Sequence, residues 1–274
     1  MNFKDIIKIS RPRFWTYFAG TYAVGYSLAA TSTEQFGLIF FAFLLYFTLP
    51  ANFFVYGIND YFDFDTDRLN PKKKHKEYLL KKQNKKTIKN LLYIPLILAF
   101  ILAIFMPKTA PFLIAFLVLG ALYSAPPIRF KARPYLDSIS NTFYVIPGFL
   151  GYYQLSGQMP SLIITLAVLL WPIALHLYSA VPDIKPDKKA KLKTTATVLG
   201  KTKSLFLCSF IWLIVSILVF TQSIFLGILA LTYVIIPLLS FKDTLKVYWY
   251  YPYINAILGF VLFWFGGVRW SGLF

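Results

Sequence analysis

Residues 37–76 read GLIFFAFLLYFTLPANFFVYGINDYFDFDTDRLNPKKKHK, and they pass from an apolar segment into a cluster of acids and then into lysines. The apolar part is long enough to span a bilayer as a helix. The acids that follow it are Asp60, Asp63, Asp65 and Asp67. Carboxylates held this close repel one another, so the cluster predicts a bound partner of opposite charge at the helix end.

Apolar runs of similar length recur along the whole chain. Hydrophobic residues make up 58% of the sequence and charged residues only 14%, whereas soluble domains carry about 25% charged residues. We therefore expect an all-α integral membrane protein that forms one polytopic domain over residues 1–274. Its nine predicted transmembrane helices are 14–31, 36–58, 88–106, 110–125, 137–155, 161–181, 203–221, 223–241 and 252–272.

The basic residues predict how the chain crosses the membrane. Of the 28 Lys and Arg, all but Lys108 and Arg269 fall in the N-terminal segment or in alternate loops. Short basic loops mark the cytoplasmic face, so we expect the N-terminus and both acidic clusters on the cytoplasmic side of the plasma membrane. Topology and attraction to anionic lipid account for the net charge of +17, and we expect no nucleic-acid partner. Charged residues extend to Arg13, so we expect no cleavable signal peptide.

The first acidic cluster has a helical spacing. Three of its aspartates lie at i, i+3 and i+7, so they share one face if the helix continues through them. The polar stripe on that face consists of Asn52, Tyr56, Asp60, Asp63 and Asp67, with Asn59 beside it and Asp65 pointing elsewhere.

A second cluster closes the sixth apolar run, in HLYSAVPDIKPDKKAKLKTT at residues 176–195. Asp183 and Asp187 lie at i and i+4, and Pro186 breaks or restarts the helix between them. His176 falls on the same face as Asp183, either as a packed, hydrogen-bonded residue or as a ligand. Both clusters end a helix on the same side and run into lysines, which resembles a weak internal repeat.

This combination is typical of a metal–diphosphate site. Clustered hard oxygen ligands suit Mg²⁺, which is held by a few carboxylates together with substrate phosphates. The neighbouring lysines, including Lys72 and Lys188, would complement a phosphorylated ligand. The alternative is that these aspartates only end helices in solvent.

A third region, YSAPPIRFKARPYLDSISNTFYVIPG at residues 123–148, carries further polar side chains. Polar residues inside membrane helices are costly and are functional candidates by default. Asp137 could instead cap its own helix. The candidates for substrate binding here are Tyr123, Ser124, Arg129, Lys131, Asn141 and Tyr144.

Together these residues resemble the UbiA-type family of intramembrane prenyltransferases. The family's motif NDxxDxxxD matches Asn59, Asp60, Asp63 and Asp67, and its DxxxD matches Asp183 and Asp187. Its Tyr-Ser pair followed by a basic residue matches Tyr123, Ser124 and Lys131, and its early Arg-Pro matches Arg11 in SRPRFW. A departure from the family is Pro186, where many members have a small residue.

The resemblance implies a bundle of nine helices around a central pocket, with Mg²⁺, expected as two ions, between the two acidic motifs. It implies an alkyl transferase that takes a prenyl group from an allylic diphosphate and gives it to a lipophilic acceptor from the bilayer. Four blocks, including SRPRFW and NDYFDFDTDRLNPKK, look closest to the lycopene elongase branch. That branch joins a dimethylallyl group to lycopene, so we expect lycopene or a related carotenoid as acceptor.

Other functions stay open at this point. Prenylation of a quinone precursor, or of another aromatic or lipid acceptor, shares the same motifs. A cation transporter would also use clustered carboxylates, although it should carry acids at mid-depth, and none falls there. Another Mg²⁺-dependent membrane transferase is the third possibility. The high aromatic content, 19% of the chain, favours a reaction through an allylic cation, because aromatic faces attract cations.

Overall fold

The computed structural model describes residues 1–64 and 78–270, the last four of these by their backbone only. The regular structure in this part of the chain is helical. Contacts divide the chain into two compact units, and each is described by itself. The first unit contains residues 1–128, 143–159 and 252–274, and the second contains residues 129–142 and 160–251. The prediction of a single domain stays a prediction.

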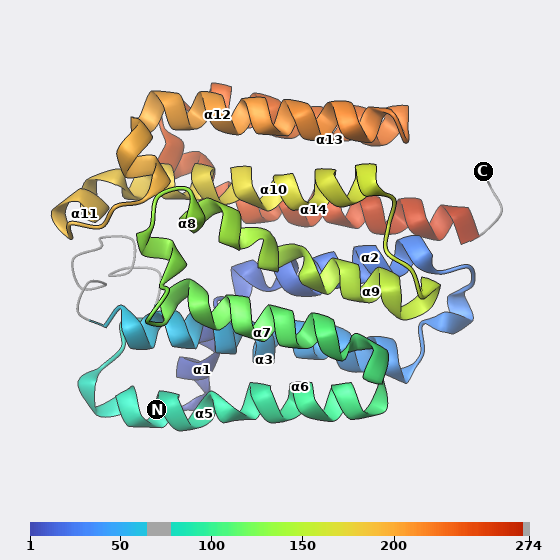
Figure 1. Cartoon of the computed structure of the whole chain (residues 1–274), viewed down its shortest axis with the longest axis horizontal. Helices are drawn as coiled ribbons and strands as arrows, with labels where there is room; N and C mark the ends of the chain where they lie inside the picture. The colour runs from blue at the N-terminus through green and yellow to red at the C-terminus, as the bar shows by residue number, and fades with distance from the viewer. Residues whose placement is uncertain (65–77, 271–274) are drawn as a thin grey trace. The chain divides into compact units, whose positions relative to one another are not determined.

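The first unit is built from long helices linked by short turns. In Figure 1, α5 and α6 follow one another almost in line, and α7 returns beside α6. Its helices are α1 (Phe3–Ser10), α2 (Thr21–Ala29), α3 (Leu38–Phe62), α5 (Lys85–Leu91), α6 (Tyr93–Phe105), α7 (Ala110–Ser124), α9 (Ile146–Ser156) and the end of α14 (Thr244–Trp270).

Within this unit α2 and α9 approach closely through glycines. A Cβ atom built on Gly25 would lie 2.0 Å from the backbone oxygen of Gly148, and one on Gly151 would lie 2.5 Å from the oxygen of Tyr22. Small residues allow backbones to approach in this way, and membrane helices commonly pack through them. The contact fixes α9, and therefore Tyr144 just before it, against the N-terminal helices.

The second unit holds a helical hairpin over a third helix. Helices α12 and α13 lie side by side, and α10 packs against α12. Its buried core is aromatic, with the Tyr178 and Tyr251 rings 5.0 Å apart and the Trp212 and Tyr251 rings 5.9 Å apart. Its helices are α8 (Leu136–Ile139), α10 (Leu162–Ala180), α11 (Ile184–Lys189), α12 (Thr195–Phe220), α13 (Ile224–Leu239) and the start of α14.

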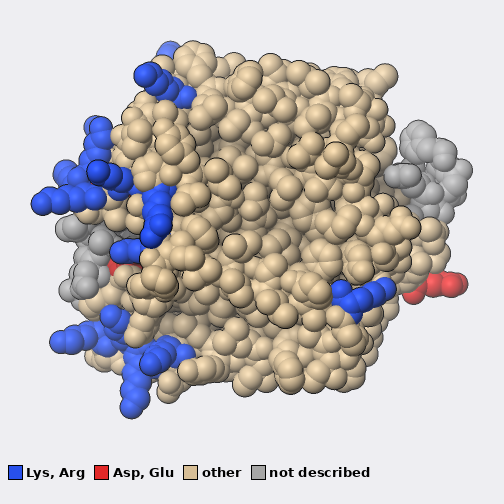
Figure 2. Space-filling view, viewed as in Figure 1, with Lys and Arg blue, Asp and Glu red and all other residues tan. Residues whose placement is uncertain are grey.

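The surfaces of both units suit a bilayer. Large apolar side chains are exposed along whole helices, as in α6, where Ile97 is 57% exposed and Phe100 67%. Figure 2 shows Lys and Arg gathered near helix ends, with wide surfaces free of charged side chains between them on that face. Five helical runs in the described residues are long and apolar enough to cross a membrane: Leu38–Phe62, Lys82–Phe105, Pro107–Ser124, Leu162–Lys189 and Thr195–Phe220. Nine spans and a cytoplasmic N-terminus stay predictions.

The expected span 137–155 is not one regular helix. It divides into α8, a 3₁₀ segment (Ser140–Val145) and α9. Pro147 lies in the first turn of α9, where its missing N–H removes no hydrogen bond, while a helix continuing through it would lose one. The side-chain amide of Asn141 donates to the backbone oxygen of Asp137, which satisfies that carbonyl near the break.

The helix that carries the first acidic motif ends earlier than the spacing argument required. α3 ends at Phe62, and Asp63 is its C-cap, with φ −95° and ψ 9°. Asp side chains compete for backbone hydrogen bonds and are poor helix formers, which accounts for a stop in this Asp-rich stretch. The shared helical face therefore holds for Asn52, Tyr56 and Asp60 and extends to Asp63, whose backbone N–H still donates to the Asn59 oxygen at 2.9 Å, while Asp67 lies outside the described residues.

Candidate functional site

In the first unit, an ion pair joins the end of α1 to the end of α3. The guanidinium of Arg11 donates to the Asp60 carboxylate at 2.9 Å, and the two side chains are 11% and 2% exposed. Arg11 caps the C-terminus of α1 in the left-handed region, with φ 51°. The chain turns at Arg11 and continues into the 3₁₀ segment that begins at Pro12. The Arg11 guanidinium lies over the Tyr56 ring, 4.4 Å from its centroid. One guanidinium thus contacts both a buried carboxylate and an aromatic face.

Two further side-chain contacts bring predicted site residues together in the first unit. The hydroxyls of Tyr56 and Tyr144 lie 3.1 Å apart, and the Asn59 amide donates to the Ser124 hydroxyl at 3.1 Å. Tyr56, Asn59 and Asp60 all come from the last turns of α3. The Tyr123 ring, next to Ser124, lies 6.0 Å from the Phe143 ring. Asn59 of the first acidic motif therefore contacts Ser124 of the Tyr-Ser pair.

Asn52 has a local role that its spacing did not indicate. Its side-chain amide donates to the backbone oxygens of Phe47 and Thr48, at 2.9 and 2.6 Å. Pro50 lies inside α3 at this point. Its missing N–H leaves the carbonyl of Tyr46, four residues earlier, without its usual donor, and Asn52 donates to the two carbonyls that follow it. Asn52 is fully buried, and its own side-chain oxygen has no hydrogen-bond partner among the described residues.

In the second unit, Asp183 and Asp187 stand on two consecutive short helical segments. A 3₁₀ turn (Val181–Asp183) follows α10, and α11 begins at Ile184 with Asp183 as its N-cap. Pro186 falls in the first turn of α11, so the helix restarts before the proline and not at it. Lys188, in the last turn of α11, is exposed. Lys72 lies outside the described residues.

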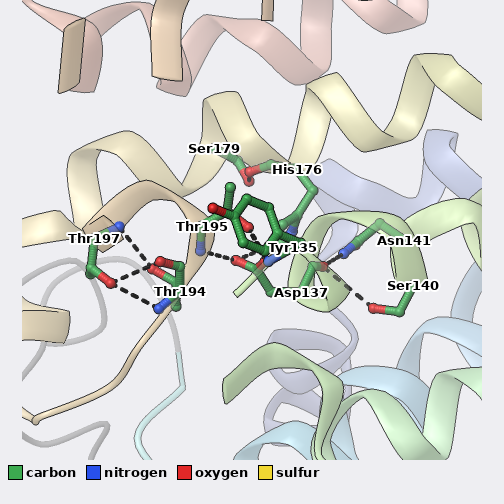
Figure 3. A network of polar contacts seen from close by, with 9 residues as sticks. All are labelled: Tyr135, Asp137, Ser140, Asn141, His176, Ser179, Thr194, Thr195 and Thr197. Carbon is green, nitrogen blue, oxygen red and sulfur yellow. Dashed lines mark hydrogen bonds and ion pairs between the residues drawn. The ribbon is translucent and has the colours of Figure 1, made fainter. Parts of the chain in front are cut away.

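A buried polar network lies next to this segment (Figure 3). The Asp137 carboxylate accepts from the backbone N–H of Thr195 at 2.9 Å and from the Thr195 hydroxyl. The Nε2 atom of His176 lies 3.9 Å from the same carboxylate. Asp137 therefore meets the N-terminus of α12 and not, as a local cap, that of its own helix. Thr195 was missed by the sequence analysis, where only the T-x-x-T capping pattern at Thr194 could have marked this helix start.

Two predicted basic residues occupy a tight turn of the second unit. Arg129 adopts a left-handed backbone with φ 47° and precedes a 3₁₀ turn (Phe130–Ala132) that contains Lys131. Both side chains are partly exposed. They stay candidates for a phosphorylated ligand.

The donor chemistry of the acidic residues fits Mg²⁺. The described residues gather no three Asp, Glu, His or Cys side chains close enough to hold a metal ion by themselves. Each unit nevertheless presents a pair of carboxylates, and those of the first unit, Asp60 and Asp63, are 1% and 8% exposed. Mg²⁺ is commonly held by one or two carboxylates, with waters and substrate phosphates as its other ligands. A pair in each motif is therefore compatible with that ion.

Comparisons with known proteins agree with the motifs and the fold. The chain is 39% identical to the lycopene elongase/hydratase of Haloarcula japonica, over 93% of this chain and 88% of that protein. Identity to the protein of the same name from Halobacterium salinarum is also 39%, over 97% and 98%. A UbiA homolog from Archaeoglobus fulgidus, determined with DMAPP and Mg²⁺, shares the fold with a TM-score of 0.78 at 23% identity, over 97% of this chain and 99% of that one. The model of the UbiA prenyltransferase family matches residues 18–267, and the chain is a membrane prenyltransferase of that family.

Proposed function

We propose that the protein transfers a dimethylallyl group from its diphosphate to the end of lycopene or a related carotenoid. The observation that carries this proposal is the 39% identity, over nearly the whole chain, to proteins named lycopene elongase/hydratase. The UbiA homolog with the same fold was determined with DMAPP and with GPP, each together with Mg²⁺. These structures support an allylic diphosphate as donor and Mg²⁺ as cofactor.

The acidic residues and Arg11 are the proposed donor site. Asp60 and Asp63 of the first motif and Asp183 and Asp187 of the second would hold Mg²⁺, with Asp67 as a further sequence-based candidate. Bound Mg²⁺ stabilises the negative charge that grows on the departing pyrophosphate. Arg11 brings a permanent positive charge to the same helix end as Asp60, which favours binding of the anionic diphosphate.

The aromatic residues beside Arg11 suit the allylic cation that remains after the diphosphate leaves. The Tyr144 ring lies 5.9 Å from Tyr17 and 4.9 Å from Phe18, and the Tyr56 ring lies 5.7 Å from Phe14. Aromatic faces attract cations, and the Arg11 guanidinium already lies over Tyr56. These rings would stabilise the cation and exclude water that would otherwise quench it.

The acceptor step needs alignment more than activation. A terminal alkene of lycopene attacks the allylic carbon, so the carbon–oxygen bond to the diphosphate breaks and a carbon–carbon bond forms. The new tertiary cation then loses a proton or captures water. An alkene needs no base to become a nucleophile, and holding it beside the allylic cation supplies the rate gain.

Expression in a lycopene-accumulating bacterium tests the proposal. Carotenoids heavier by one or two isoprene units should appear, detected by mass spectrometry, and the Asp183→Asn variant should leave lycopene unaltered. Unaltered lycopene together with prenylation of a quinone precursor by the purified protein would overturn the carotenoid assignment. It would favour the aromatic acceptor instead.

A further inference from the structure

The segment that carries the second acidic motif is attached at both of its ends to one buried carboxylate. Residues 177–194 comprise the last turn of α10 and the connection from α10 to α12, and they contain Asp183 and Asp187. His176 lies immediately before this segment and Thr195 immediately after it, and both lie against Asp137 (Figure 3). The loop is therefore closed at its base by a residue from a third helix, α8.

The contact at the Thr195 end is reciprocal. Asp137 is fully buried and accepts from both the backbone N–H and the hydroxyl of Thr195. The backbone N–H of Tyr135 donates in turn to the Thr195 hydroxyl at 2.7 Å. A carboxylate at a helix N-terminus is favoured by the helix dipole. The start of α8 and the start of α12 are thus fixed to each other by three hydrogen bonds.

Inside the segment, two backbone hydrogen bonds close the C-terminal end of α11. The backbone N–H groups of Leu192 and Lys191 donate to the backbone oxygens of Asp187 and Lys188, at 2.9 and 3.2 Å. These bonds form a Schellman motif, in which Lys191 takes the left-handed position with φ 56°. Only residues 193 and 194 separate this closure from Thr195. The position of Asp187 is therefore linked through a short connection to the anchor at Asp137.

We propose that Asp137 is a positioning residue for the second acidic motif: by holding both flanks of residues 177–194, it sets the geometry in which Asp183 and Asp187 present their carboxylates. This inference rests on the proposed role of those two aspartates in Mg²⁺–diphosphate binding. Asp137 lies outside both acidic motifs, so it acts through the backbone that it anchors and through His176.

Replacing Asp137 or Thr195 should weaken the binding of the metal ion by the second acidic motif. Asp137→Asn keeps the size of the side chain and one acceptor oxygen, but removes the charge opposite the α12 N-terminus and His176. Replacing residues that orient the metal ligands without touching the metal typically lowers metal affinity by about 10- to 100-fold. We therefore expect Asp137→Asn and Thr195→Val to raise the Mn²⁺ concentration needed for half-saturation by about tenfold or more. Thr195→Ser, which keeps the hydroxyl, should restore nearly normal binding.

The experiment uses the full-length protein in detergent with inorganic pyrophosphate. Electron paramagnetic resonance measures Mn²⁺ binding directly, and product formation against Mg²⁺ concentration gives a second readout. Asp243→Asn is the matched control, because Asp243 accepts from the backbone N–H of Lys246 at the start of α14, at 2.9 Å, and so caps a helix of the same unit remote in sequence from the motif. Thermal unfolding is recorded for every variant, and Thr195→Val decides the case if Asp137→Asn does not fold.

The outcomes separate this inference from the proposed function. Weaker Mn²⁺ binding in Asp137→Asn and Thr195→Val, with Asp243→Asn unchanged, supports the positioning role. Normal binding in Asp137→Asn while Asp183→Asn loses the metal overturns the positioning role alone. Equal weakening in Asp243→Asn overturns it too, because removing the carboxylate charge from the start of any helix in this unit would then suffice. Normal binding in Asp183→Asn overturns both the positioning role and the metal site on which it rests.

Discussion

Asp60 has a structural partner as well as a proposed chemical role, so its replacement should show two effects. Asp60→Asn should lower turnover by about 100-fold or more and should also lower stability, because the Arg11 guanidinium, in a side chain that is only 11% exposed, loses its ion pair with this carboxylate. Breaking a buried ion pair costs about 3–5 kcal/mol. Asp187→Asn should lose similar activity with a smaller loss of stability, since Asp187 is only partly buried. Rates and thermal unfolding in detergent measure both effects, and equal destabilisation by the two variants would contradict this division.

Lys191 is a second residue with a clear prediction. It holds the left-handed position that ends α11, with φ 56°, and a residue other than glycine pays about 1 kcal/mol there. Lys191→Gly should therefore raise the unfolding free energy by about that amount. Lys189→Gly is the matched control, because Lys189 is the last helical residue of α11, where glycine is a poorer helix former than lysine. Thermal unfolding should move in opposite directions for the two variants, and two shifts of the same sign would refute the explanation.

Residues could be assigned from the sequence where one helix carries them. Tyr56 and Asp60 share a face of α3 because their spacing is helical, and that face was predicted. The partner of Asp137 could not be found in this way, since Thr195 is 58 positions away and no periodicity links two separate helices. The family resemblance marked Arg11 as a candidate site residue, but nothing in the sequence indicated its ion pair with Asp60.

At the scale of elements, the α2–α9 contact leaves no room for a side chain. Gly25→Ala would place a Cβ atom 2.0 Å from the backbone oxygen of Gly148, and overpacking of this kind typically costs about 1–3 kcal/mol. Gly259→Ala is the control, because nothing lies within 4 Å of a Cβ atom there and alanine favours a helix. Thermal unfolding of the purified variants should fall for Gly25→Ala only. An unchanged midpoint for Gly25→Ala would mean that the two helices can separate without loss.

Apolar runs predicted the long helices well and the interrupted ones poorly. Leu38–Phe62 and Thr195–Phe220 each contain a long apolar stretch, so length and composition suffice to find that stretch, although not the polar start of α12 or the kink at Gly200 within it. The span 137–155 was expected as one helix, but its middle is a 3₁₀ segment that depends on Pro147 and on the side chain of Asn141. A hydropathy profile cannot show the missing N–H of Pro147 or the side-chain hydrogen bond of Asn141, because each changes a single backbone hydrogen bond and not the apolar character of the segment.

At the scale of the whole molecule, the distribution of basic residues predicts sidedness. Single cysteines introduced at Arg133 and Lys189, in a chain whose buried Cys208 is replaced by alanine, should react with an impermeant thiol reagent only from the cytoplasmic side. A cysteine at Lys108 should react only from outside, because it lies in a loop of the opposite set. Labelling of intact cells and of inverted vesicles measures this. Reaction of the Lys108 and Lys189 positions from the same side would contradict the predicted topology.

The anchoring of Thr195 by Asp137 also bears on biosynthesis. A ribosome makes Asp137 well before it makes Thr195, so the nascent chain holds a carboxylate at a site that is later fully buried, and its principal donor does not yet exist. An unpaired charge is costly in a lipid-like environment, so α8 cannot settle in its final place until the start of α12 has been made. The second acidic motif, which lies between them in the chain, therefore acquires its final geometry late in synthesis. A chain truncated before Thr195 should be recognised as unfinished by membrane quality control.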